Sequence, residues 1–214
     1  MKSKIQSLKN GNKKTVIKKL FLTAAVAVSS VTFAQQFGAK AGMNVSTISD
    51  EGFDDTKSKV GYYAGVFMNV PVSESFSIQP EVLYNNLGSK VSSTVLGTTY
   101  SSTLNLDYVA VPVMFQYKAT PQFYLEAGPE FRFLVGAKQK FDDGSSSTVT
   151  ELDKEDFNSF NMGVGLGLGF DISKNVGLNA RYVAGFSDIT KESGPAADAK
   201  NKNNTFQVGL NIKF

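Results

Sequence analysis

Six charged side chains of both signs stand inside otherwise apolar stretches of this sequence. They are Lys40, Glu81, Glu126, Glu130, Arg132 and Arg181. A pair of carboxyl groups can act as acid and base only when the two lie close together. Glu126 and Glu130 are four residues apart, which in a strand separates them by about 13 Å at ~3.3 Å per residue. That separation is too large for a cooperating dyad, so we interpret the six side chains as an interior ion-paired network.

The residue inventory also argues against chemistry at this network. The chain of 214 residues has no His and no Cys, which removes the commonest general base and any thiolate ligand. The loop segment "FDDG" holds part of a calcium-loop pattern but lacks the remaining ligands and the closing Glu. We therefore expect no enzymatic activity, no metal site and no cofactor.

The N-terminus has the pattern of an export signal. Residues 1–19 hold seven Lys and no acid, and "LFLTAAVAVSSV" over 20–31 is apolar. Thr32 and Ala34 then supply small residues at the third-last and last positions before a cut, which completes the three regions of a secretory signal peptide. A membrane anchor is the alternative, but twelve residues are too few to span a bilayer. We predict a signal peptide over 1–34 and a single domain over 35–214.

The charge of that domain excludes one class of partner. Residues 35–214 keep 15 basic and 19 acidic side chains, a net charge of −4, although the full chain carries +3. Because no basic cluster remains once the leader is removed, we expect no nucleic-acid partner.

Period-two alternation of apolar and polar residues organises the domain, and such alternation is typical of strands. The last segment, "FQVGLNIKF", places Phe206, Val208, Leu210, Ile212 and Phe214 on one side without a miss. Eight strands are predicted, near 36–48, 60–70, 76–84, 106–117, 123–135, 160–171, 176–182 and 206–214. The second is ambiguous because both of its faces hold apolar residues. Pro80, Pro112 and Pro129 predict bulges or local distortions inside strands.

The connections between these strands alternate strictly between long polar segments and short turns. The short ones are "PVSES", "KATPQ" and "ISKN". Ten tilted residues rise roughly 23 Å, close to the ~25 Å apolar band of outer-membrane barrels, which have short turns at one end and long loops at the other. The pattern predicts an all-β fold, an eight-stranded antiparallel up-and-down transmembrane β-barrel.

A secreted or periplasmic soluble calyx, with its apolar face turned inward around a hydrophobic ligand, shares this alternation. Two features favour a barrel whose apolar face contacts lipid on the outside. The charged residues lie on the polar face, where they can pair inside a narrow lumen. The apolar face ends in aromatic residues, as in the aromatic bands at the two membrane interfaces of such barrels. The polar face also carries a glycine stripe, which indicates either space for long side chains or strand curvature. Its members are Gly163, Gly165, Gly167 and Gly169.

The segments "LDYVAVPVMFQYK", "FYLEAGPEFRFLVG", "GLGLGFDIS" and the terminal "FQVGLNIKF" resemble the small outer-membrane β-barrel family generically labelled "porin family". The resemblance extends over 36–214. It implies an integral protein of a Gram-negative-type outer membrane, in contact with outer-membrane lipid, and gives Phe214 a role as the insertion signal read by the barrel-assembly machinery. We expect a monomer with a structural or interaction role or limited small-solute passage; the pattern identifies no ligand for the outer loops.

Overall fold

The computed structural model describes residues 35–49, 57–95, 98–154, 157–189 and 202–214. The predicted signal peptide lies outside these residues. The described ranges form nine strands: β1 (Gln36–Ser49), β2 (Lys57–Pro71), β3 (Phe76–Val95), β4 (Thr98–Lys118), β5 (Phe123–Asp142), β6 (Ser147–Glu151), β7 (Phe160–Asp171), β8 (Val176–Gly185) and β9 (Lys202–Lys213). No helix of the described part is long and apolar enough to cross a membrane.

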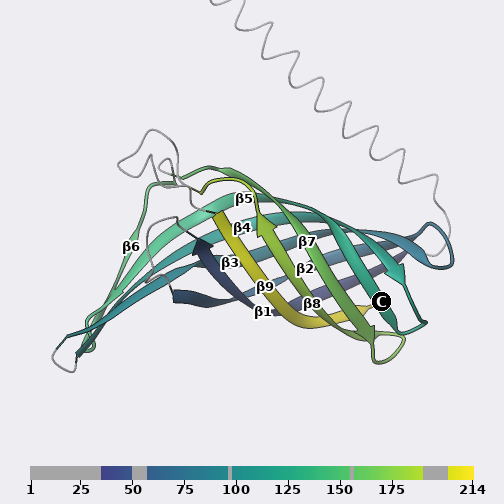
Figure 1. Ribbon diagram of the computed structural model, residues 1–214, viewed down its shortest axis with the longest axis horizontal. Coiled ribbons are helices and arrows are strands. Elements are labelled where there is room, and N and C mark those ends of the chain that lie inside the picture. The colour runs from purple at the N-terminus through teal and green to yellow at the C-terminus, as the bar shows by residue number, and fades with distance from the viewer. Residues whose placement is uncertain (1–34, 50–56, 96–97, 155–156, 190–201) are drawn as a thin grey trace, which may run out of the picture. The chain divides into compact units, whose positions relative to one another are not determined.

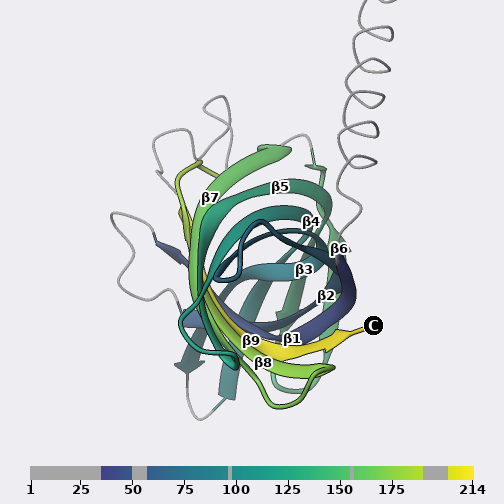
Figure 2. The same cartoon turned by 90° about the vertical axis from the view of Figure 1, so that its right-hand side faces the viewer.

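Eight of the strands close into a ring. Each pairs antiparallel with its neighbour in the chain, β5 with β7 included, and β9 returns to pair with β1. The view along the ring axis shows this closure (Figure 2). β6 lies outside the ring and pairs only with the C-terminal end of β5, from Lys138 to Asp142. The predicted eight-stranded antiparallel barrel is therefore confirmed, with one accessory strand.

Three tight turns gather at one end of the barrel, which we call the short-turn end; the C-terminus lies there too (Figure 1). Each turn uses a hydroxyl group that accepts a backbone N–H three residues later. Ser73 accepts from Phe76 at 3.1 Å, Thr120 from Phe123 at 2.9 Å, and Ser173 from Val176 at 3.1 Å. Such side-chain caps satisfy backbone donors that a two-strand turn leaves open.

The apolar face of the barrel wall points outward. In β7, Phe160, Leu166 and Phe170 are exposed while the alternate positions are buried or half-buried. In β4, Met114 and Ala110 point inward and are fully buried, whereas Phe115 is exposed on the outer face. Aromatic side chains meet near both ends of the wall. Their ring pairs are Phe76–Tyr117 at 5.0 Å near the short turns, and Tyr62–Tyr84 at 6.0 Å and Phe133–Phe160 at 5.3 Å near the other end.

The ambiguity of the second predicted strand has a steric cause. Tyr63 and Phe67 point into the barrel and are buried, so β2 has large apolar side chains on both faces. A Cβ atom on Gly38 would lie 2.2 Å from the Phe67 ring, and one on Gly42 would lie 2.8 Å from the Tyr63 ring. The inward aromatics of β2 therefore fit only because β1 offers glycines opposite them.

The prolines distort the sheet differently from the prediction. Pairing of β3 with β4 is interrupted beyond Pro80, and pairing of β4 with β5 is interrupted beyond Pro112, yet the register is the same on both sides of each gap. Of the predicted bulges or local distortions, Pro80 and Pro112 thus show local distortion without a bulge. At Pro129 the pairing with β7 is continuous. The register shifts lie elsewhere, between Ser58 and Tyr63 on β2 and at Asp107–Tyr108 on β4.

Two of the segments interpreted as long polar loops are largely strand. β3 runs to Val95 and β4 begins at Thr98, so the region 85–103 is a hairpin, and β6 forms within the region 138–159. These extensions are rich in Ser, Thr and Val, which suit strands, but they lack a one-sided apolar pattern. The far ends of β3 and β4 together with β6 mark the opposite end of the barrel, which we call the long-loop end.

Candidate functional site

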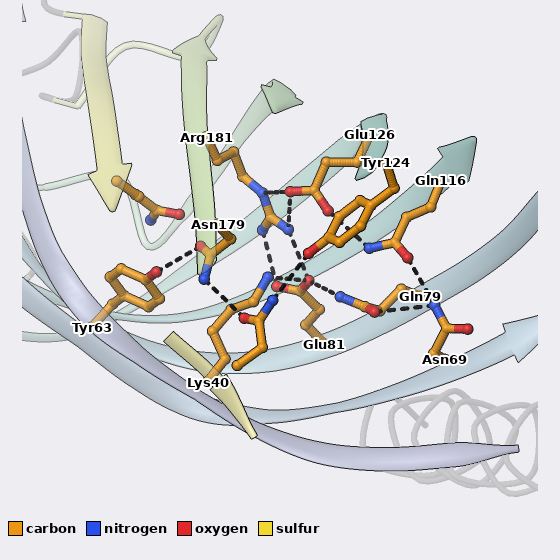
Figure 3. Close-up of polar contacts among 12 residues, drawn as sticks. Lys40, Tyr63, Asn69, Gln79, Glu81, Gln116, Tyr124, Glu126, Asn179 and Arg181 are labelled. Carbon is orange, nitrogen blue, oxygen red and sulfur yellow. Dashed lines mark hydrogen bonds and ion pairs between the residues drawn. The ribbon is translucent and has the colours of Figure 1, made fainter. Parts of the chain in front are cut away.

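A cluster of four charged side chains fills the middle of the lumen (Figure 3). Arg181 on β8 donates Nη1 and Nη2 to the two carboxylate oxygens of Glu81 on β3, at 2.9 and 2.8 Å. Its Nε donates to Glu126 Oε1 on β5 at 2.7 Å. Lys40 on β1 donates to Glu81 Oε1 at 2.9 Å. All four side chains are buried, so two cations and two carboxylates neutralise one another out of contact with bulk solvent.

Amide side chains satisfy the carboxylate oxygens further. Gln79 donates to Glu81 Oε1 at 2.8 Å, and Gln116 donates to Glu126 Oε2 at 3.0 Å. Asn69 donates in turn to the Gln116 carbonyl oxygen at 2.8 Å. A buried ion pair is stable only when its remaining hydrogen-bonding sites are also satisfied, and these amides satisfy them on the side of the short turns.

A second set of polar contacts joins β2 to β8, β9 and β5. Tyr63 donates its hydroxyl proton to Asn179 Oδ1 at 2.8 Å, and Asn179 donates to Asn211 Oδ1 at 2.8 Å. Asn211 then donates to the Tyr124 hydroxyl oxygen at 3.0 Å. Polar side chains from opposite walls therefore meet across the lumen, which leaves the middle of the barrel filled.

The other two predicted charges form a separate pair. Arg132 Nε donates to Glu130 Oε1 at 2.5 Å, both on β5, and both side chains are buried. Within the described residues no hydrogen bond or ion pair joins this pair to the cluster around Arg181. The structure thus places all six predicted charges inside the barrel but divides them into a group of four and a group of two.

The glycine stripe on β7 makes room for these groups. A Cβ on Gly165 would lie 3.1 Å from Met114 and 3.3 Å from Arg181, and one on Gly167 would lie 2.9 Å from Glu126 Oε1. One on Gly169 would lie 2.1 Å from the Tyr124 ring. Of the two interpretations of the stripe, space for long inward side chains is the one that these contacts support.

An apolar cap closes the lumen toward the long-loop end. Phe157 and Ile189, from the segments after β6 and β8, are buried against inward residues of the wall. Their partners on the strands are Leu87, Leu106, Tyr108 and Ala137. Sequence reasoning missed the cap because Phe157 and Ile189 are single apolar residues in polar segments, without a periodic neighbour.

This arrangement is suited to filling and bracing a barrel. The six predicted charges are paired, and the described residues include no group of three or more His, Cys, Asp or Glu side chains that could hold a metal ion. The inward amides and tyrosines were not among the predicted site residues, although several of them share the parity of the charges in the sequence, a signal that could have added them. An inner face this polar is the reverse of a hydrophobic calyx, so the soluble alternative is not favoured.

Comparisons with known proteins place the chain in a family. The family model described as outer membrane protein beta-barrel domain matches residues 33–191, well over half of the chain. The protein therefore belongs to the outer-membrane β-barrel proteins, in agreement with the resemblance drawn from its strands. A comparison with curated proteins gave no match.

Several solved structures are similar to the chain. The attachment invasion locus protein Ail of Yersinia pestis is 15% identical, with 85% of this chain and 100% of that chain covered and a TM-score of 0.49. Neisserial surface protein A is 12% identical, with 85% and 99% covered and a TM-score of 0.48. OprG of Pseudomonas aeruginosa is 16% identical, with 85% and 96% covered and a TM-score of 0.42.

Proposed function

We propose that the chain is exported by its signal peptide and inserted into the outer membrane as a closed barrel without an open pore. In this arrangement the short-turn end and both termini of the mature barrel face the periplasm, as is usual for such barrels. The long-loop end faces outward, where its loops and the extended wall of β3 to β6 meet lipid, ligands or other surfaces. The role is structural or one of interaction, without catalysis.

The contact of Arg181 with Glu81 and Glu126 carries this proposal. The cluster ties β3, β5 and β8 together in the middle of the lumen, and a narrow eight-stranded barrel leaves little space beyond its own side chains. The apolar cap around Phe157 and Ile189 adds a second obstruction toward the long-loop end. Passage of small solutes would require both to open, so we regard it as the weaker candidate.

Cell fractionation tests the location. We expect the full-length protein in the outer-membrane fraction, with a gel mobility in detergent that changes on boiling, as a folded barrel unfolds only when heated. Recovery in the soluble fraction without a mobility shift would overturn the proposal and return the calyx as the explanation.

Conductance in planar bilayers tests the closed lumen. We expect no discrete channel events from the wild-type barrel. A variant with Glu81→Ser, Glu126→Ser and Arg181→Ser combined with Phe157→Ser and Ile189→Ser, checked for folding by its gel mobility, is the matched control. It should conduct because its lumen loses both the crossing side chains and the apolar cap. Steady conductance by the wild-type protein, equal to that of the variant, would favour solute passage instead.

A further inference from the structure

A groove of about 660 Å³ lies on the outside of the barrel wall, above the outer aromatic pair Tyr62–Tyr84. It crosses β1 to β5 at the long-loop end and has two distinct parts. Three lysines, Lys59, Lys90 and Lys140, line its upper part, and Met43, Val60 and Tyr62 form its lower part. We call it the lysine groove.

The groove follows from the backbone of β2 and β3. Their pairing shifts register between Ser58 and Tyr63, so the ladder opens there and the wall is locally hollow. Beyond the shift, Lys90 on β3 is opposite Thr103 on β4, and Thr103 is opposite Lys140 on β5. Residues directly opposite in a sheet share a face, so this row presents Lys90 and Lys140 to the same side.

The groove is cationic although the domain as a whole is acidic. Its lining holds the three lysines and no carboxylate, whereas residues 35–214 carry a net charge of −4. Lys90 has no ion-pair partner among the described residues. Lys140 approaches Asp142 only at 3.9 Å, with both side chains half exposed, and such surface pairs are weak.

The third lysine is held in place by neutral oxygens. Lys59 donates to the Leu87 carbonyl oxygen at 3.1 Å and to the side-chain oxygen of Asn86. The Asp107 carboxylate accepts from the Asn86 amide at 2.6 Å and lies outside the groove lining. Lys59 is buried at the floor of the groove, where backbone and amide oxygens hold it, so the exposed cations of the groove are Lys90 and Lys140.

The lower part of the groove is continuous with the lipid-facing wall. Met43, Val60 and Tyr62 are 63%, 59% and 56% exposed, and they lie on the apolar parity of their strands. A ligand that covers both parts needs apolar chains below and negative charge above. Basic pockets beside a membrane span have that preference for anionic lipid headgroups.

We propose that the lysine groove binds the phosphate-bearing headgroup of an outer-leaflet lipid, with its acyl chains along Met43, Val60 and Tyr62. Lipopolysaccharide has this chemistry. The inference rests on the proposed orientation, with the long-loop end in the outer leaflet. A soluble protein partner fits less well, because half of the groove lies on the surface that faces the bilayer.

Binding to the purified barrel in detergent tests the inference. The probes are lipid A carrying both phosphates, the same lipid after removal of its phosphates, and inorganic phosphate as competitor. The variant is Lys90→Gln with Lys140→Gln, and the matched control is Lys118→Gln with Lys174→Gln, two exposed lysines at the short-turn end. Gel mobility establishes that each variant is folded.

We expect the groove variant to lose roughly ten- to thirtyfold in affinity for diphosphorylated lipid A, since each lysine near an anionic surface contributes about 1 kcal/mol. The control variant should bind like wild type, and the dephosphorylated lipid should bind weakly to all three proteins. An equal loss in the control, or tight binding of dephosphorylated lipid, would overturn the inference. Competition by inorganic phosphate at the same concentration would reassign the groove to free phosphate. Absence from the outer membrane in cells would instead contradict the proposed function, independently of this result.

Discussion

Arg181 on β8 and Glu81 on β3 join opposite walls of the barrel through two hydrogen bonds of 2.9 and 2.8 Å, although 100 residues separate them in the chain. The strand order places β4, β5 and β7 between them on one side of the ring and β9, β1 and β2 on the other. The pair is therefore a cross-lumen strut, and Glu126 and Lys40 brace it from two further strands.

Arg181→Met should strongly destabilise the barrel. The substitution leaves Glu81 and Glu126 buried without the guanidinium, and removal of one partner of a buried pair typically costs about 3–5 kcal/mol. Urea unfolding in lipid vesicles, followed by gel mobility, measures the free energy of unfolding. Lys174→Met, at an exposed cation of a short turn, is the control and should change little. Equal unfolding midpoints for the two variants would contradict the strut.

Arg132→Ala should also destabilise the barrel, by a smaller amount. Its loss leaves the Glu130 carboxylate buried and unpaired, but Arg132 makes a single ion pair and lies outside the cluster around Arg181. The same urea titration compares the two arginine variants. An unfolding free energy for Arg132→Ala equal to that of wild type would show that the lumen does not depend on this pair.

Gly169→Ala should cost about 1–3 kcal/mol through overpacking. The new Cβ would lie 2.1 Å from the Tyr124 ring, whereas the same change at Gly136 meets its nearest atom at 3.1 Å. Gly136→Ala is therefore the milder matched substitution. In a Tyr124→Ala background the cost of Gly169→Ala should largely disappear, because the ring that it displaces is absent. Strict additivity in this cycle would return strand curvature as the reason for the glycine.

The sequence predicted which charges lie inside but not how they pair. A charge on one parity of an apolar strand is visible because it must avoid lipid, and that argument located Lys40, Glu81 and Arg181 on the inner face. Their partners depend on which strands face each other after closure and on the stagger between them. Those quantities are set by the whole ring, so no local pattern separates the group of four from the Glu130–Arg132 pair.

The parts of the fold that extend beyond the membrane were the least predictable. Alternation of apolar and polar residues arises where one face of a strand is apolar and the other polar. The β3–β4 hairpin at the long-loop end and β6 have water on both sides, so their strands are polar throughout. Polar strands of this kind have the composition of loops, which is why the sequence predicts a loop over the region 85–103. The Phe157–Ile189 cap was hidden for the opposite reason, because isolated apolar residues show no period.

The Asp143 carboxyl group, in the turn after β5, should titrate at a lower pH than an ordinary Asp. Backbone N–H groups of Ser146 and Ser145 donate to Asp143 Oδ1 at 2.7 and 2.9 Å, and the Ser146 hydroxyl donates to Oδ2 at 3.0 Å. These bonds hold the pKa of the Asp143 carboxyl below its ordinary value of 3.8. Because the Asp143 pKa is lower in the folded turn than in the unfolded chain, the ionised carboxylate stabilises the turn at any pH above the ordinary pKa. This stabilisation is lost as the pH falls through the lowered pKa of the folded turn.

Amide chemical shifts of Ser146 in detergent micelles measure this titration. The expected midpoint lies below 3.8, and Asp143→Asn should abolish the low-pH transition at Ser146 while leaving the barrel resonances in place. A midpoint at or above the ordinary value would contradict the hydrogen-bonded turn.

Deletion of Phe214 should reduce the amount of barrel assembled in cells far more than it reduces stability. The Phe214 N–H donates to the Phe37 carbonyl oxygen at 2.8 Å, and one such bond contributes about 0.5–1.5 kcal/mol. The ring itself is 77% exposed, so the folded barrel depends on it little. A residue that serves as an insertion signal is needed before folding is complete, which is why outer-membrane levels should fall while refolding of purified protein in vitro is nearly normal.

Phe206→Ala removes a similar exposed ring from the other end of β9 and is the control. Unchanged membrane levels on deletion, or an equal fall with Phe206→Ala, would assign Phe214 to lipid contact alone.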